Sequence, residues 1–368
     1  MAYGDALGFL YENTGEKPTS LRKFNYKYND YLSIDKQEGQ YSYITELMLI
    51  MIKCMIDDSK DLRLVVDYKG FYDELMLWKY YRHGSPEGIL TRIQANNYYK
   101  SSFYWEDKNC SGINRVIPIL LANNNYYLAE MEVYKNVIYF NRQAEIVFTG
   151  LLILRTGYLI LQNPMINKDE LLQELKNYLI NLQLKELNRN MRKNFNNKYN
   201  IQFEKEKIQY LIELDRYKRS RNLSDVSNNK IILYAIENYF ILHEGGKLNL
   251  NNLPYKYKKE IISIAYSYWG MCGKGYDMAR NSLKDESFIC EMGKFLYRLR
   301  KNKINRKVYP VQETEIDIFK LEPNQMIKHP ILNAMRVIDK EETDHYIKVL
   351  VQTKSCIYTF IKQRNKTG

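Results

Sequence analysis

The sequence predicts an all-α fold that carries a small β or mixed extension at its C-terminal end. Two segments, Thr45–Ile56 and Ile146–Leu161, are apolar on all faces, which is typical of helices buried in a core. Asp169–Asn188 instead places its leucines on one stripe, as an amphipathic surface helix does. Beyond Lys301, β-branched residues and alternation between 346 and 361 predict a short pair of strands.

Four further segments carry apolar residues at helical spacing and complete the expected bundle. We expect one helical domain over residues 1–300, with an exposed polar insertion near 189–200, and a C-terminal extension over 301–368. The four additional helical segments are 208–217, 231–243, 258–269 and 286–299.

The chain is strongly basic, with a formal net charge of +12 over 368 residues. Such a balance suits a nucleic acid or another acidic partner. The densest basic region, Lys185–Arg221, is interrupted by acids such as Glu204 and Asp215. A nucleic-acid interface and an ordinary solvated basic surface therefore both remain open for this region.

The cysteine pattern and the N-terminus bear on the cellular compartment. Five cysteines at long spacings form no CxxC pair, which argues against a zinc ribbon or a disulfide framework and favours a reducing compartment. The opening Met1–Asp5 lacks the basic and apolar regions of a secretion signal. Arg155 interrupts the apolar run at Ile146–Leu161, and an arginine within a spanning helix costs about 2.5–3.5 kcal/mol. We expect a soluble, cytoplasmic protein without membrane association.

One string near the N-terminus, Gly4–Glu12 (GDALGFLYE), carries the most information about function. Its glycines allow close backbone approach at a short helical opening. Asp5 and Glu12 supply two carboxylates at positions where helices can converge. The string resembles the GDALGxxxE opening of the ADP-ribosylglycohydrolase family.

Further segments extend this resemblance in the same order along the chain. The family has a T-D-D-T motif about forty residues later, at the start of a long apolar helix, where this chain has Ser42–Thr45 (SYIT). Lys108–Pro118 resembles the family's RGNGAAMRxxP block. Arg115 and Pro118 match it, but the glycines of the block are not matched in their positions. The resemblance covers residues 1 to about 285. It implies an orthogonal helical bundle, hydrolysis of ADP-ribosyl bonds and two magnesium ions at the centre of the bundle.

The departures from the family pattern fall on the residues that the resemblance assigns to the metals. The T-D-D-T aspartates become Tyr43 and Ile44, and the family's late GGDxDT motif falls on Trp269–Lys274, with Met271 and Gly273 among its positions. Magnesium requires hard oxygen ligands, usually including carboxylates. We therefore predict no metal ligand at these positions and no cofactor, with magnesium present only if the site has been rebuilt.

The leading hypothesis is a pseudoenzyme that binds ADP-ribose or ADP-ribosylated partners, or that acts as a scaffold. Backbone donors of a turn next to a helix start can hold a pyrophosphate without a metal. Two alternatives remain open: an active hydrolase with a remodelled metal site that uses Glu12 as general base, and a nucleic-acid-binding protein that uses Lys185–Arg221. The candidate catalytic residue is Glu12, and the candidate ligand-binding residues are Asp5, Ser42, Thr45, Ser111, Gly112 and Asn114.

Overall fold

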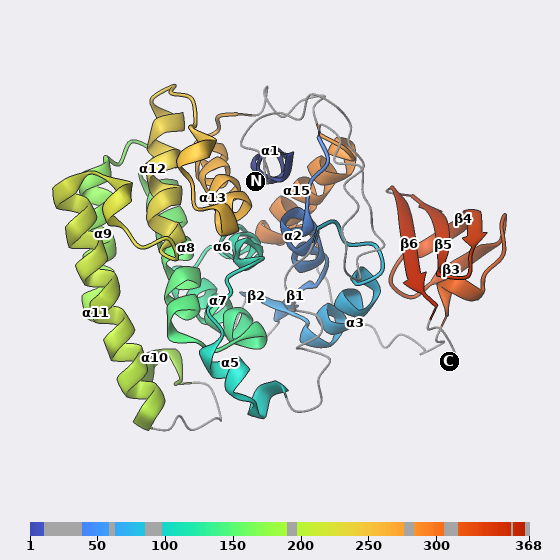
Figure 1. The fold of residues 1–368 in the computed structure, drawn as a ribbon, viewed down its shortest axis with the longest axis horizontal. Helices are drawn as coiled ribbons and strands as arrows, with labels where there is room; N and C mark the ends of the chain where they lie inside the picture. The colour runs from blue at the N-terminus through green and yellow to red at the C-terminus, as the bar shows by residue number, and fades with distance from the viewer. Residues whose placement is uncertain are drawn as a thin grey trace.

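The fold combines a helical body with two antiparallel sheets (Figure 1). A two-stranded sheet lies within the helical body, and a four-stranded sheet stands at the C-terminal end. The all-α prediction is therefore wrong, and the fold class is mixed. The computed structural model describes residues 1–10, 39–58, 63–84, 98–189, 197–275, 283–304, 316–354 and 356–364.

The small sheet was not predicted, because its first strand directly follows a buried helix in the sequence. Strand β1 (Met55–Asp58) pairs with β2 (Arg63–Val66), and each is only four residues long. Met55 and Ile56 continue the apolar run of the preceding helix, so periodicity could not separate strand from helix there. The helix ends at Lys53, and Cys54 forms its C-cap.

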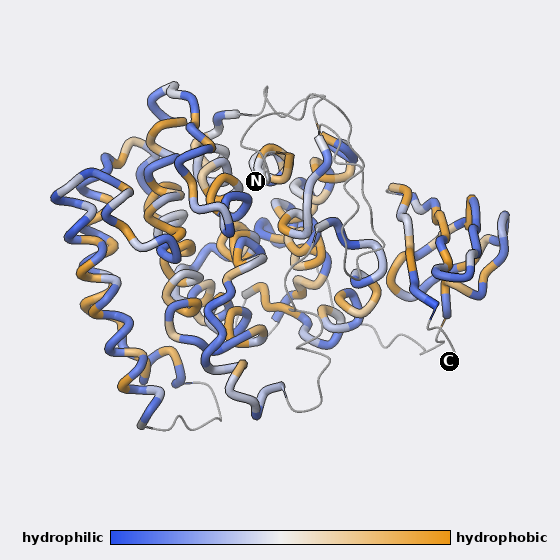
Figure 2. The backbone as a smooth tube through the Cα atoms, in the orientation of Figure 1, coloured by the Kyte–Doolittle hydropathy of each residue, from blue (hydrophilic) through white to orange (hydrophobic). Residues whose placement is uncertain are grey.

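The helical body is built around one long central helix, α8, which contacts the helices on either side of it. Figure 2 shows hydrophobic stretches along the central helices, whereas α11 at the edge alternates between hydrophobic and hydrophilic residues. The described α-helices are α1 (Ala2–Leu10), α2 (Tyr43–Lys53), α3 (Tyr68–Trp78), α5 (Ser102–Glu106), α6 (Ile117–Ala122), α7 (Tyr126–Phe140), α8 (Ala144–Gln162), α9 (Lys168–Asn181), α10 (Leu184–Leu187), α11 (Asn197–Ser220), α12 (Ile231–His243), α13 (Lys258–Met271) and α15 (Glu286–Arg300).

Two of the predicted helices can be compared in detail with the structure. The apolar segment expected as a buried helix is α8, whose side chains from Ala144 to Leu154 are buried. By length and composition alone α8 is also able to cross a membrane. The single helix expected over Asp169–Asn188 is instead divided at Leu182 into α9 and α10. Of the expected insertion near 189–200, residues 190–196 lie outside the described residues, and 197–200 form the first turn of α11.

The C-terminal sheet is a meander of β3 (Met326–His329), β4 (Asn333–Glu342), β5 (Tyr346–Thr353) and β6 (Ile357–Gln363), in that spatial order. The expected strand pair corresponds to β5 and β6, while β3 and β4 were not foreseen. The sheet contacts the helical body just after α3. The Tyr81 ring packs edge-on against Tyr358 and Phe360, with centroids 4.9 and 5.5 Å apart, and the Ile361 amide donates to the Tyr80 carbonyl at 3.0 Å.

Glycines let α1 lie unusually close to α13. A Cβ atom at Gly4 would lie 2.8 Å from the Ile262 carbonyl oxygen and 2.9 Å from Tyr266 Cβ. A Cβ atom at Gly8 would lie 2.9 Å from Lys259 Cα. The neighbours at both positions include backbone or Cβ atoms, which cannot move aside without shifting a helix. The two glycines of the N-terminal string therefore have a packing role.

We predict that Gly4→Ala lowers the free energy of unfolding by about 1–3 kcal/mol, because the added methyl group overpacks the contact between α1 and α13. Gly293→Ala in α15 is the matched control, since a Cβ atom added there would have no described neighbour within 4 Å beyond the helix's own backbone. There the loss of glycine flexibility is expected to raise stability by roughly 0.5–1 kcal/mol. Urea unfolding of both variants checks this, and equal effects of the same sign would contradict it.

Candidate functional site at the start of helix α2

The N-terminus of α2 surrounds the carboxylate of Asp5. This side chain is fully buried and reaches α2 from the neighbouring helix α1. Its Oδ2 accepts hydrogen bonds from the Ser42 amide at 2.9 Å, the Thr45 amide at 3.0 Å and the Thr45 hydroxyl at 2.7 Å. Its Oδ1 accepts from the Ser42 hydroxyl at 2.6 Å. A helix N-terminus favours an anion at this place through its free N–H groups and its dipole.

These four hydrogen bonds engage both oxygens of the Asp5 carboxylate, three at Oδ2 and one at Oδ1. An ionised carboxyl group offers about four lone-pair sites. Burial raises the pKa of Asp5, while the hydrogen bonds from Ser42 and Thr45 act in the opposite direction. The Ser42 hydroxyl also accepts from the Ile44 amide at 3.3 Å and so completes the N-cap of α2. Asp5, Ser42 and Thr45 thus form a closed capping unit.

Tyr43 fills the space beside this capping unit. Its side chain is 2% exposed, and its hydroxyl donates to Glu260 Oε1 at 2.7 Å. The Lys259 ammonium lies 4.6 Å from the centre of the Tyr43 ring. Ile44 is completely buried. The two positions that the resemblance assigns to aspartates are therefore a hydrogen-bonded phenol and an apolar core residue.

Glu260 is a fully buried acid at the start of α13. Burial raises its pKa, whereas the neighbouring Lys259 and the hydrogen bond from Tyr43 lower it. Its Oε2 finds no hydrogen-bond partner among the described residues. Its backbone carbonyl accepts from Asn114 Nδ2 at 3.1 Å, which ties the Ser111–Asn114 turn to this cluster.

The conformation of the Ser111–Asn114 turn is fixed by contacts with the residues next to it in the sequence. Gly112 adopts a left-handed conformation with φ of 73°, and its carbonyl accepts from the buried Arg115 guanidinium at 2.9 Å. The cavity that Ser111, Arg115 and Asn141 help to line has a volume of about 20 Å³. This is room for about one water molecule, not for a pyrophosphate.

A second acid on α2, Glu46, also accepts several hydrogen bonds. It accepts from Trp78 Nε1 at 2.7 Å and from the His83 amide at 3.1 Å, and it lies 2.5 Å from His83 Nδ1. Beside it, a cleft of about 60 Å³ separates α2 from the C-terminal sheet, with Tyr41 and Cys356 among its lining residues.

The structure brings some of the predicted site residues together and separates others. Asp5, Ser42 and Thr45 touch one another, and Asn114 joins them through Glu260 and Tyr43. Glu12 lies outside the described residues. Met271 lies eleven residues along α13 from Glu260, which is about 16 Å of helix.

Met271 and Gly273 are therefore remote from the start of α2. Met271 packs near Gly157 of α8, and Gly273 follows the end of α13. The segment that does meet the start of α2 precedes α15. The Lys284 amide donates to the Gly39 carbonyl at 3.0 Å, and the Tyr41 hydroxyl donates to Asp285 Oδ2 at 3.0 Å. An acid just before a helical segment was the sequence signal available for Asp285.

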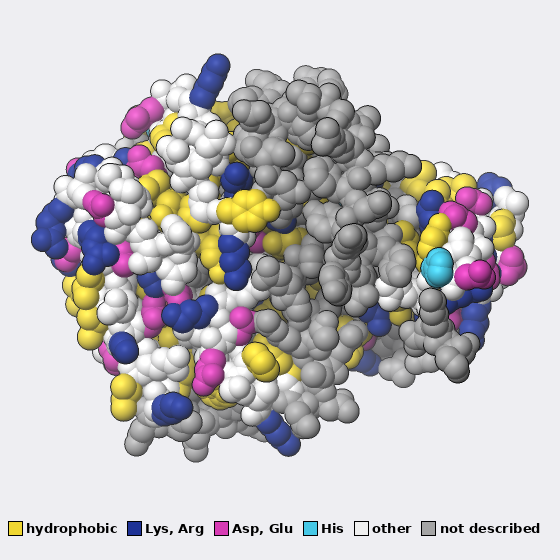
Figure 3. Space-filling model, in the orientation of Figure 1, with side chains coloured by type: hydrophobic (Ala, Val, Ile, Leu, Met, Phe, Trp, Pro, Cys, Tyr) yellow, Lys and Arg dark blue, Asp and Glu magenta, His cyan; other side chains and the backbone are white. Residues whose placement is uncertain are grey.

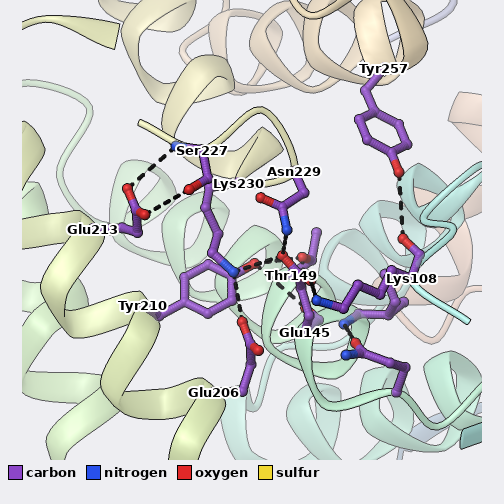
Figure 4. Close-up of polar contacts among 12 residues, drawn as sticks. Lys108, Glu145, Thr149, Glu206, Tyr210, Glu213, Ser227, Asn229, Lys230 and Tyr257 are labelled. Atoms are coloured by element: carbon purple, nitrogen blue, oxygen red, sulfur yellow. Dashed lines mark hydrogen bonds and ion pairs between the residues drawn. The ribbon is translucent and has the colours of Figure 1, made fainter. Parts of the chain in front are cut away.

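A separate buried network joins α8, α11 and the start of α12 (Figure 4). Figure 4 shows Lys230 reaching between Glu145 and Glu206, with Nζ–Oε1 distances of 2.7 and 2.6 Å. Asn229 also donates to Glu145, and Lys108 lies 3.4 Å from its other oxygen. Both acids therefore have cationic partners, which indicates a packing role. Within the described parts of the chain, no group of three or more His, Cys, Asp or Glu side chains is placed to hold a metal ion.

The described parts of the basic region, 185–189 and 197–221, do not form a uniform positive face. Several of its cations bind acids: Lys207 binds Glu204 at 2.7 Å, and Arg216 binds Glu213 at 3.2 Å. On the face drawn in Figure 3, basic and acidic side chains are interspersed over the described surface. This pattern gives no support to a nucleic-acid interface here, because such interfaces gather unpaired cations.

No family model matches the chain, and no curated protein matches it.

We predict that Asp5→Asn lowers the free energy of unfolding by on the order of 3 kcal/mol. The asparagine amide would keep one acceptor oxygen but place an NH2 donor where the other oxygen now accepts, and hydrogen bonds to a charged group contribute about 1.5–3 kcal/mol each. Asp317→Asn is the matched control, because Asp317 Oδ1 caps a short helix and, among the described residues, accepts from the Phe319 amide alone, at 3.1 Å. Asn caps as well as Asp, so a change within about 0.5 kcal/mol is expected. Chemical denaturation measures both, and a small effect of Asp5→Asn would contradict the capping role.

We predict that Glu260 makes stability fall as pH rises. Because its pKa is raised in the folded state, the folded protein keeps a proton that the unfolded chain releases above its ordinary value of 4.5. Unfolding is then favoured progressively from about pH 4.5 up to the raised pKa. Glu260→Gln removes this titration and accepts the same Tyr43 hydrogen bond. Melting temperatures of both proteins between about pH 4 and 8 should diverge, with the variant gaining on the wild type as pH rises. Parallel curves would contradict the prediction.

Proposed function

We propose that this protein is a pseudoenzyme built on an ADP-ribosylglycohydrolase-like plan, which acts as an interaction scaffold and not as a metal-dependent hydrolase. The observation that carries the proposal is that Ser42 and Thr45 donate hydrogen bonds to both oxygens of the Asp5 carboxylate at the start of α2. The family resemblance itself rests on the motif residues.

The residues at the start of α2 do not fit magnesium. The resemblance places two magnesium ions there, and magnesium needs near-octahedral oxygen ligands that include carboxylates. Asp5 and Glu46 are already bound by several donors, and Tyr43 and Ile44 supply no carboxylate. Glu260 has one oxygen without a partner among the described residues, but its raised pKa favours the protonated form, which is a poor ligand.

The size of the cavities supports a scaffold over a nucleotide receptor. The two cavities next to the predicted ligand-binding residues, as bounded by the described residues, measure about 20 and 60 Å³. Pockets for drug-sized ligands measure about 300–1,000 Å³. ADP-ribose belongs to that larger class, so neither of these two cavities accommodates it without rearrangement.

We predict that the protein neither binds magnesium at the start of α2 nor releases ADP-ribose. Isothermal titration with Mg²⁺, with Mn²⁺ and with ADP-ribose should give no specific heat, and an ADP-ribosylated protein substrate should keep its modification with or without Mg²⁺. Magnesium-dependent release of ADP-ribose would overturn the proposal in favour of an active hydrolase. ADP-ribose binding that persists in EDTA would overturn the scaffold role in favour of a receptor.

A further inference from the structure

Helix α11 has a second apolar face that points away from the helical body. Ile201, Ile208 and Ile212 are 70%, 53% and 43% exposed. Their spacings of seven and four residues place them on one side of the helix. The opposite side carries Phe203, Tyr210 and Tyr217, which are buried against the body. Figure 1 places α11 along the left edge of the molecule, far from α2, and Figure 3 shows hydrophobic side chains along that edge.

The exposed stripe has the spacing of a coiled-coil seam. Ile201, Lys205, Ile208, Ile212, Asp215 and Arg219 follow one another at alternating intervals of four and three residues. Such an interval pattern defines the positions through which two helices pack side by side. Apolar residues occupy the middle of the seam, a lysine lies on one side of them, and an aspartate lies on the other.

We propose that a second copy of this chain packs on the stripe, with the two α11 helices antiparallel. The two-fold axis crosses the stripe midway between Ile208 and Ile212. In that arrangement Ile208 contacts the partner's Ile212, and Lys205 faces the partner's Asp215. Ile201 lies against the aliphatic stem of the partner's Arg219. Every contact occurs twice, because a two-fold interface uses the same surface on both subunits.

Charge selects the antiparallel arrangement over the parallel one. Parallel helices would set Lys205 against the partner's Lys205 and Arg219 against the partner's Arg219, which repel. The antiparallel pair instead brings a cation to each aspartate. Asp215 is partly exposed and already binds Lys176 at 2.8 Å, so its carboxylate would bridge two lysines.

The test is sedimentation velocity of the full chain over a concentration series reaching about 100 μM, because small interfaces bind weakly. The wild type should show a monomer–dimer equilibrium. Ile208→Glu should weaken it at least about a hundredfold, since the buried charge appears twice in the interface. Ile180→Glu is the matched control: this isoleucine is 56% exposed on α9, outside the stripe, and its replacement should leave the dissociation constant unchanged.

A charge exchange tests the direction of the helices. Lys205→Glu alone should weaken the dimer about tenfold, and adding Asp215→Lys in the same chain should restore it in part, because the facing charges are again opposite while the ion pair between Asp215 and Lys176 is lost. Circular dichroism confirms that each variant is folded. A wild type that stays monomeric overturns the proposal. So does a dimer that survives Ile208→Glu, or one that Ile180→Glu disrupts.

Discussion

The buried carboxylate of Asp5 organises this end of the molecule. A charge taken out of water must be matched by hydrogen bonds or an opposite charge, because an unmatched one costs several kcal/mol. Here the match comes from the first turn of α2, through two amides and two hydroxyls. The position of α1 is then restricted on two sides: Asp5 holds it to α2, and Gly4 and Gly8 bring it against α13. Three helices are thereby held in one arrangement.

Tyr43 and Glu260 connect the remaining parts of the cluster through further buried hydrogen bonds. The phenol of Tyr43 links the start of α2 to the start of α13, and the Glu260 carbonyl links α13 to the turn at Asn114. The resemblance assigns this convergence of helix starts to two magnesium ions. In this chain the polar groups at that place bind one another and hold the helices together. These contacts among the polar groups are the physical basis for proposing a pseudoenzyme.

The helices were more predictable than the strands or the contacts. Periodicity over a dozen or more residues revealed α8 and α13, whereas β1 and β2 are too short to show a period of their own. The motif pointed to Asp5, Ser42 and Thr45 together. It could not predict that these residues hydrogen-bond to one another, because that depends on how α1 meets α2 in space. Glu260 and Asp285 contact residues more than 200 positions away, and no local pattern reports such a contact.

The most direct test of the account is the response of this cluster to a paramagnetic ion. The amide resonances of Ser42 and Thr45 should keep their linewidths when Mn²⁺ is added, because both oxygens of the Asp5 carboxylate already accept hydrogen bonds that a metal ion would have to displace or compete with. Transverse-relaxation-optimised NMR of the amide-labelled protein makes this measurement residue by residue. Selective broadening of these two resonances at low Mn²⁺ concentration would contradict the account, since it would place a metal ion at the start of α2.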